Sequence, residues 1–118
     1  MELWNNPSCS KCAAARDTLS GAGVEFTLRA YLDVPPTVRE FDGVLGRLGA
    51  QPWDVCRTGE DVYTELGMAD WARDAGSRAA WLDAMVAHPV LIQRPIVLLD
   101  DGSAVVARDR ATLDRLTG

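Results

Sequence analysis

The fold is decided near the start of the chain, by the stretch Trp4-Asn5-Asn6-Pro7-Ser8-Cys9-Ser10-Lys11-Cys12-Ala13-Ala14-Ala15-Arg16. A short apolar run precedes its two cysteines and an alanine-rich run follows them, which predicts a strand, a turn and a helix. Unpaired N–H groups and a partial positive charge at a helix N-terminus favour a thiolate, which is the reactive form of cysteine. The same N–H groups can bind an oxyanion. We therefore expect Cys9 to be an exposed, activated thiol and Cys12 to be a shielded partner that can resolve a disulfide.

Outward from this stretch, the pattern predicts a β-α-β start. The expected elements are a strand over Glu2–Trp4, a helix over about Ser10–Ser20 and a strand over Val24–Leu28. Strands joined through a helix should be parallel. In such a context a Cys-x-x-Cys pair is typical of redox chemistry.

A helical block is expected over about residues 37–87. Pro35-Pro36 breaks the chain, Thr37 begins a helix, and the buried stripe of that helix should be Val38, Phe41, Leu45 and Leu48. Ser77 is expected to cap a longer helix whose apolar face is Ala80, Trp81, Ala84 and Met85.

The chain then returns to strands. We expect a strand over Ile96–Leu99, a turn, a strand over Ala104–Ala107 and a helix capped by Asp109. The order β-α-β, helical block, β-β-α predicts an α/β protein with a thioredoxin-like fold and an inserted helical block, as one domain over 1–118. In that fold a cis proline precedes the third strand beside the thiol, and Pro95 stands in that structural position.

Composition excludes several classes of protein. The 118 residues carry a net charge of −5, which argues against a nucleic-acid partner. No apolar run is long enough to cross a membrane, and no signal peptide is recognisable, so we expect a cytoplasmic protein. Three cysteines and a single histidine, His88, favour neither a disulfide framework nor a metal site. Cys56 is expected to be a buried small residue.

Three segments together resemble a known family. They are Asn6–Lys11, Trp53–Thr58 and His88–Ile96, in this order. The sequence resembles the glutaredoxin-coupled arsenate reductase (ArsC) family, which has the Spx-type regulators as relatives. The resemblance implies that Cys9 attacks arsenate to form a thiolate adduct, and that three arginines bind the oxyanion: Arg57, Arg94 and Arg108. It also implies no bound cofactor and an external reductant, which is glutathione with glutaredoxin, mycothiol with mycoredoxin, or thioredoxin.

Two departures from the family keep alternatives open. Asn5 stands where a histidine is often found and Ala13 where an arginine is often found, so two positive charges that would help to ionise Cys9 are absent. In another register, Cys12 and Arg16 take the nucleophile and arginine positions. Cys12 also permits a general thiol-disulfide oxidoreductase that uses the Cys9–Cys12 pair. A third hypothesis is a redox-sensing regulator of the Spx type that binds RNA polymerase.

Overall fold

The computed structural model describes residues 1–117. The chain forms two compact units, one made of Met1–Val34 with the chain from Arg94 onward, and one made of Pro35–Gln93. The helices expected over residues 37–87 all lie in the second unit. The organisation as a single domain remains a prediction.

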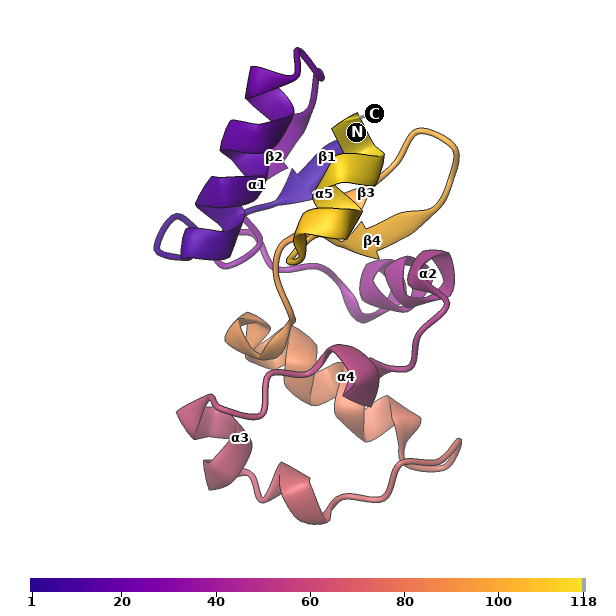
Figure 1. The fold of residues 1–118 in the computed structure, drawn as a ribbon. Helices are drawn as coiled ribbons and strands as arrows, with labels where there is room; N and C mark the ends of the chain where they lie inside the picture. The colour runs from indigo at the N-terminus through magenta and orange to yellow at the C-terminus, as the bar shows by residue number, and fades with distance from the viewer. Residues whose placement is uncertain (118) are drawn as a thin grey trace. The chain divides into compact units, whose positions relative to one another are not determined.

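The first unit holds a four-stranded mixed sheet in the order β2-β1-β3-β4 (Figure 1). Strand β1 pairs parallel with β2 and antiparallel with β3, and β3 pairs antiparallel with β4. The predicted β-α-β and β-β-α orders are thereby confirmed. The elements are β1 (Glu2–Trp4), α1 (Ser10–Gly21), β2 (Thr27–Arg29), β3 (Ile96–Leu98), β4 (Ala104–Val106) and α5 (Arg110–Thr117).

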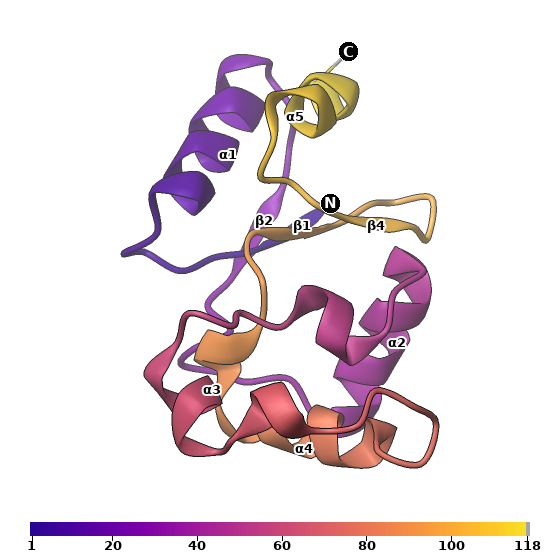
Figure 2. The same cartoon turned by 60° about the horizontal axis from the view of Figure 1, so that its bottom comes forward.

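One face of this sheet carries the core of the first unit. Successive side chains of a strand point to opposite faces, so Leu3 and Trp4 of β1 are directed to different sides. Leu3 pairs with Val97 of β3, and helices α1 and α5 lie side by side over their face (Figure 2). The buried cluster consists of Leu3, Ala15, Leu19, Val97, Ala107 and Leu113.

Leu19 offers a test of this core. Its side chain is fully buried in the cluster, so Leu19→Ala is expected to lower the free energy of unfolding by about 2–5 kcal/mol. Leu28, which is 53% exposed, is the matched control, and Leu28→Ala should change the free energy of unfolding by less than about 0.5 kcal/mol. Urea unfolding of the two variants measures the difference. Equal losses would contradict the assignment of Leu19 to the core.

Strand β2 begins at Thr27, so the predicted start at Val24 is wrong. The pairing register sets Glu2, the first residue of β1, opposite Thr27, and residues 24–26 therefore lie beyond the end of β1. The N–H of Val24 instead donates to the carbonyl of Leu19 at 3.0 Å, which closes the end of α1. The alternating apolar pattern arises because Val24 and Phe26 pack against the core without forming a ladder.

The second unit is helical. Thr37 caps α2 by accepting a hydrogen bond from the N–H of Glu40 at 3.0 Å, and Gly49 ends that helix with φ of +68°. Trp81 of α4 is fully buried, with Trp53 and Trp71 edge-on to its ring at centroid distances of 6.0 and 5.4 Å. The elements are α2 (Val38–Leu48), α3 (Asp61–Glu65), α4 (Arg78–Ala87) and the 3₁₀ turns η1 (Pro52–Val55), η2 (Met68–Asp70) and η3 (Pro89–Leu91).

Two predicted helix faces and one predicted cap are wrong in detail. In α2, Val44 is buried while Val38 is exposed, and in α4, Leu82 is buried while Ala80 is exposed. Ser77 precedes α4, but its ψ of −9° is helical, and an N-cap side chain reaches the helix N–H groups from extended backbone. Its hydroxyl donates instead to the carbonyl of Ala72 at 2.6 Å.

No helix among residues 1–117 combines the length and the apolar character that crossing a lipid bilayer requires.

Candidate active site

The two cysteines lie on a turn that the sequence closes with its own side chains. The side chain of Asn6 accepts a hydrogen bond from the N–H of Ser8 at 2.9 Å, and its carbonyl accepts one from the N–H of Cys9 at 3.0 Å. The N–H of Asn6 points at the sulfur of Cys12 at 3.5 Å. Cys9 thereby becomes the N-cap residue of α1, with Cys12 one turn inside the helix.

Cys9 has an unusually acidic thiol. Burial raises its pKa, but hydrogen bonds from the Arg94 guanidinium, from the backbone and thiol of Cys12 and from the backbone of Lys11 outweigh burial and lower the pKa from 9.0 to about 7. Cys9 is a buried residue, only 8% exposed, so the predicted exposed thiol is wrong. The activation expected at a helix N-terminus is present, and about half of the thiol is thiolate at neutral pH.

Cys12 has the opposite character. It is fully buried, and burial raises its pKa, with the negative charge of Cys9 acting in the same direction against the hydrogen bond from Asn6. Cys12 is therefore the protonated member of the pair and donates to the Cys9 thiolate. The predicted shielding of Cys12 is confirmed, and both cysteines are free thiols.

Arg94 approaches Cys9 from the start of β3. The Arg94–Pro95 peptide bond is cis, as expected from the topology. The Arg94 side chain hydrogen-bonds to Cys9, while its carbonyl accepts a hydrogen bond from Nη1 of Arg108 at 2.7 Å. The first unit thus brings together Cys9, Cys12, Arg94 and Arg108.

Arg57 belongs to the second unit, where two side chains hold its guanidinium. Its Nε lies 3.1 Å from Oε1 of Glu60, and its Nη1 donates to Oε1 of Gln93 at 3.0 Å. These two partners were not found from the sequence. A pocket of about 220 Å³ lies against Arg57 and is also lined by Cys56, Thr58, Gly59 and Gln93.

The chain is similar to proteins of one known family. A family model described as the ArsC family matches residues 4–116. This chain belongs to the ArsC family. An arsenate reductase of Neisseria meningitidis is 37% identical over 109 residues, which is 92% of this chain and 90% of that protein. An "Uncharacterized protein in glnII region" of Streptomyces viridochromogenes is 50% identical over 118 residues, or 99% of both chains.

Solved structures agree with this membership. An arsenate reductase from Vibrio cholerae superposes with a TM-score of 0.85 at 30% identity, covering 98% of this chain and 97% of that one. The predicted α/β, thioredoxin-like fold with an inserted helical block is thereby confirmed for this ArsC chain.

Sequence inspection missed Tyr31. Tyr31 is the second residue after β2, and Asn5 is the first residue after β1. The carboxyl ends of paired parallel strands meet at one edge of a sheet. That rule could have placed Tyr31 beside the thiol turn. The signal was lost because the predicted strand stopped at Leu28, which left Tyr31 in an unassigned loop.

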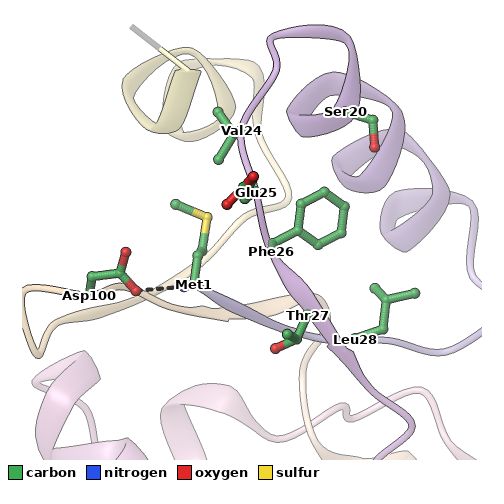
Figure 3. A pocket seen from close by; sticks show the side chains of 8 residues that line it. All are labelled: Met1, Ser20, Val24, Glu25, Phe26, Thr27, Leu28 and Asp100. Carbon is green, nitrogen blue, oxygen red and sulfur yellow. Dashed lines mark hydrogen bonds and ion pairs between the residues drawn. The ribbon is translucent and has the colours of Figure 1, made fainter.

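A larger pocket of about 800 Å³ lies elsewhere on the first unit, along β2 (Figure 3). Its charged groups include the N-terminal ammonium of Met1 and the carboxylate of Asp100, which pair with each other at 2.5 Å. None of the candidate cysteines or arginines lines it. Its remaining lining residues are Ser20, Val24, Glu25, Phe26, Thr27 and Leu28.

The three cysteines are expected to differ in reactivity. Alkylation of Cys9 should reach half its maximal rate near pH 7, whereas Cys56, whose pKa burial raises to about 11, should react only in strong base. Trypsin separates the cysteines, because cleavage after lysine and arginine leaves Cys9 in peptide 1–11, Cys12 in peptide 12–16 and Cys56 in peptide 48–57. Mass spectrometry of these peptides gives each rate. A half-maximum for Cys9 at the ordinary value of 9.0 would contradict the activation.

Proposed function

We propose that this ArsC chain is an arsenate reductase that uses Cys9 as its nucleophile. The observation that carries the proposal is the acidic Cys9 thiol, held at the start of α1 and hydrogen-bonded to Arg94. Arsenate at neutral pH is a doubly charged tetrahedral oxyanion. A thiolate can attack it only where positive groups offset the charge of both partners.

The reaction balances with two external thiols. The Cys9 sulfur bonds to arsenic, and an arsenate oxygen leaves as water after taking up protons. Arsenic then accepts two electrons, while two thiols lose two electrons and two protons to form one disulfide and a second arsenic-bound oxygen leaves as water. One water then breaks the sulfur–arsenic bond, which releases arsenite and returns the Cys9 thiol. The net reaction is arsenic acid and two thiols to arsenous acid, disulfide and water.

The arginines have distinct parts in this proposal. Arg94 binds an arsenate oxygen while it stabilises the Cys9 thiolate. Arg108, tied to the carbonyl of Arg94, supplies a second guanidinium. Arg57, in the second unit, is the third arginine that the resemblance to the family implies. Pro95 has a structural part, since it stands between Arg94 and the first residue of β3. Forked N–H groups match the geometry of a tetrahedral oxyanion better than a lysine ammonium does.

The external thiol is part of the proposal. Glutathione with glutaredoxin, mycothiol with mycoredoxin, and thioredoxin can each deliver the two electrons, and the small redox protein is the expected partner in the cytoplasm. Where an external thiol attacks the Cys9 sulfur instead, arsenite leaves with the electron pair of the sulfur–arsenic bond and a disulfide remains on Cys9. Cys12, a thiol beside Cys9, can then attack that disulfide once it loses its proton.

The test is arsenite formation by the purified protein with each of the three thiol systems in turn. We expect turnover with at least one system and no turnover when arsenate is replaced by sulfate. Absence of arsenite with all three would contradict the proposal.

The contact between Cys12 and Cys9 favours a second candidate, a general thiol-disulfide oxidoreductase. Such an enzyme needs the cysteine pair but no oxyanion site. It predicts that reduction of a disulfide substrate survives Arg94→Ala, whereas arsenate reduction does not. Loss of both activities in that variant would remove this candidate.

A further inference from the structure

Tyr31 carries a buried hydroxyl whose proton has no acceptor. The residue is fully buried, and its hydroxyl donates to no acceptor among residues 1–117. Buried polar groups are nearly always paired, because an unpaired one loses its hydrogen bonds to water without replacement. An exception next to a reactive thiol calls for an explanation.

The backbone fixes Tyr31 beside the thiol turn. The carbonyl of Arg29, the last residue of β2, accepts hydrogen bonds from the N–H of Asn5 at 2.8 Å and from the N–H of Tyr31 at 3.0 Å. Asn5, the first residue after β1, and Tyr31, the second after β2, therefore donate to the same carbonyl oxygen. The Tyr31 ring stacks on Trp4, with centroids 6.0 Å apart and planes at 23°, which limits the directions in which the phenol can point.

The phenol lies near the groups of the proposed active site. Burial raises the pKa of Tyr31 to about 12; the charge of Arg94 and a hydrogen bond from its guanidinium act to lower the pKa, while Cys12 and Cys9 act to raise it. The hydroxyl thus stays protonated across the physiological range and keeps a proton to donate. Because the hydroxyl is buried away from water, a hydrogen bond to a charged acceptor is strengthened there.

A second unpartnered atom lies at the same place. Oδ1 of Asn5, a residue only 8% exposed, has no hydrogen-bond partner within the described chain. These two atoms lie on residues that follow paired strands, and together they indicate a site completed by a polar ligand: the Tyr31 hydroxyl can donate to an oxyanion oxygen, and Oδ1 of Asn5 can accept from a protonated one.

We propose that Tyr31 is an oxyanion-binding residue, a neutral O–H donor to an oxygen of the tetrahedral oxyanion held at Cys9 and Arg94. This inference rests on the proposed function and deepens it by adding a fourth donor. An uncharged donor orients the oxyanion without adding a positive charge, so the thiolate remains the group that Arg94 stabilises.

Tyr31→Phe tests the proposal, because phenylalanine keeps the ring that stacks on Trp4 and removes only the hydroxyl. Binding is read as protection of Cys9 from alkylation by increasing arsenate, at a fixed pH. We expect the dissociation constant for arsenate to rise roughly tenfold or more, as for the loss of a hydrogen bond to a charged group. The melting temperature without ligand is measured to confirm that the variant is folded. Tyr63→Phe, at a buried tyrosine of the second unit, should leave arsenate binding unchanged.

The outcomes separate this inference from the proposed function. Wild-type protein that binds arsenate but forms no arsenite contradicts the reductase and supports the Tyr31 proposal if Tyr31→Phe weakens binding. Equal binding by wild type and Tyr31→Phe overturns the Tyr31 proposal and leaves the reductase in place. A wild-type protein that binds no arsenate overturns it as well.

Discussion

Serine in place of Cys9 is expected to abolish arsenate reduction, lowering kcat by at least about 10³-fold. A serine hydroxyl is not ionised at neutral pH and cannot form the sulfur–arsenic bond. Neither the helix N-terminus nor Arg94 can compensate, since both act by stabilising the thiolate of this one side chain. Arsenite formation under saturating arsenate and thiol measures the effect.

The other two cysteines are the matched controls. Cys56→Ser should retain full activity, and Cys12→Ser should retain arsenic chemistry even where regeneration by the thiol system slows. The opposite pattern, with loss in Cys12→Ser and activity in Cys9→Ser, would support the register in which Cys12 and Arg16 take the catalytic positions.

Removal of the Arg94 side chain is expected to have the second largest effect. Arg94→Ala takes away the foremost group that offsets burial at Cys9, so the pKa of Cys9 should rise from about 7 toward 9.0. Less thiolate is then present at neutral pH, and one oxyanion donor is lost, so we expect kcat/KM to fall by about 10²–10³-fold. The pH dependence of Cys9 alkylation gives the pKa, and initial rates at low arsenate give kcat/KM.

Two variants make this result specific. Arg94→Lys keeps the positive charge but loses the forked N–H groups, and its activity should lie between those of wild type and Arg94→Ala. Arg110→Ala removes an arginine of α5 that is 81% exposed, and should leave both quantities unchanged. An unchanged pKa of Cys9 in Arg94→Ala would show that Arg94 does not activate the thiol.

Asn5 and Ala13 stand where a histidine and an arginine are often found in the family. The loss of those two positive charges suggested that the Cys9 thiol would be poorly ionised. The structure shows otherwise, because the pKa of Cys9 is lowered to about 7 without those charges. Arg94 and the N–H groups at the start of α1 together outweigh burial. Local sequence could not reveal this balance, since Arg94 lies far along the chain and meets Cys9 only through the sheet.

Much of the secondary structure was predictable because its causes are local. The Thr37 cap, the positive-φ Gly49 and the Asp109 cap each act within a few residues. The cis bond before Pro95 followed from the order of the elements.

Features that depend on contacts between distant segments were not predictable in the same way. The start of β2 depends on where β1 begins, and the partners of Arg57 include a residue 36 positions away. The burial of Cys9 can be seen only in the folded site. The same holds for the Tyr31 hydroxyl, because a sequence pattern does not tell whether a polar atom has an acceptor.

The attachment of arsenic to Cys9 is the central claim, and trypsin makes it directly measurable. The only lysine, Lys11, lies between the two cysteines, so Cys9 and Cys12 leave on different peptides, 1–11 and 12–16. Reduced Cys12→Ser protein is mixed with arsenate and one equivalent of glutathione, quenched in acid and digested, and the peptides are weighed. The account predicts arsenic on peptide 1–11, and none on that peptide from Cys9→Ser protein. Arsenic-free peptide 1–11 from protein that still forms arsenite would contradict it.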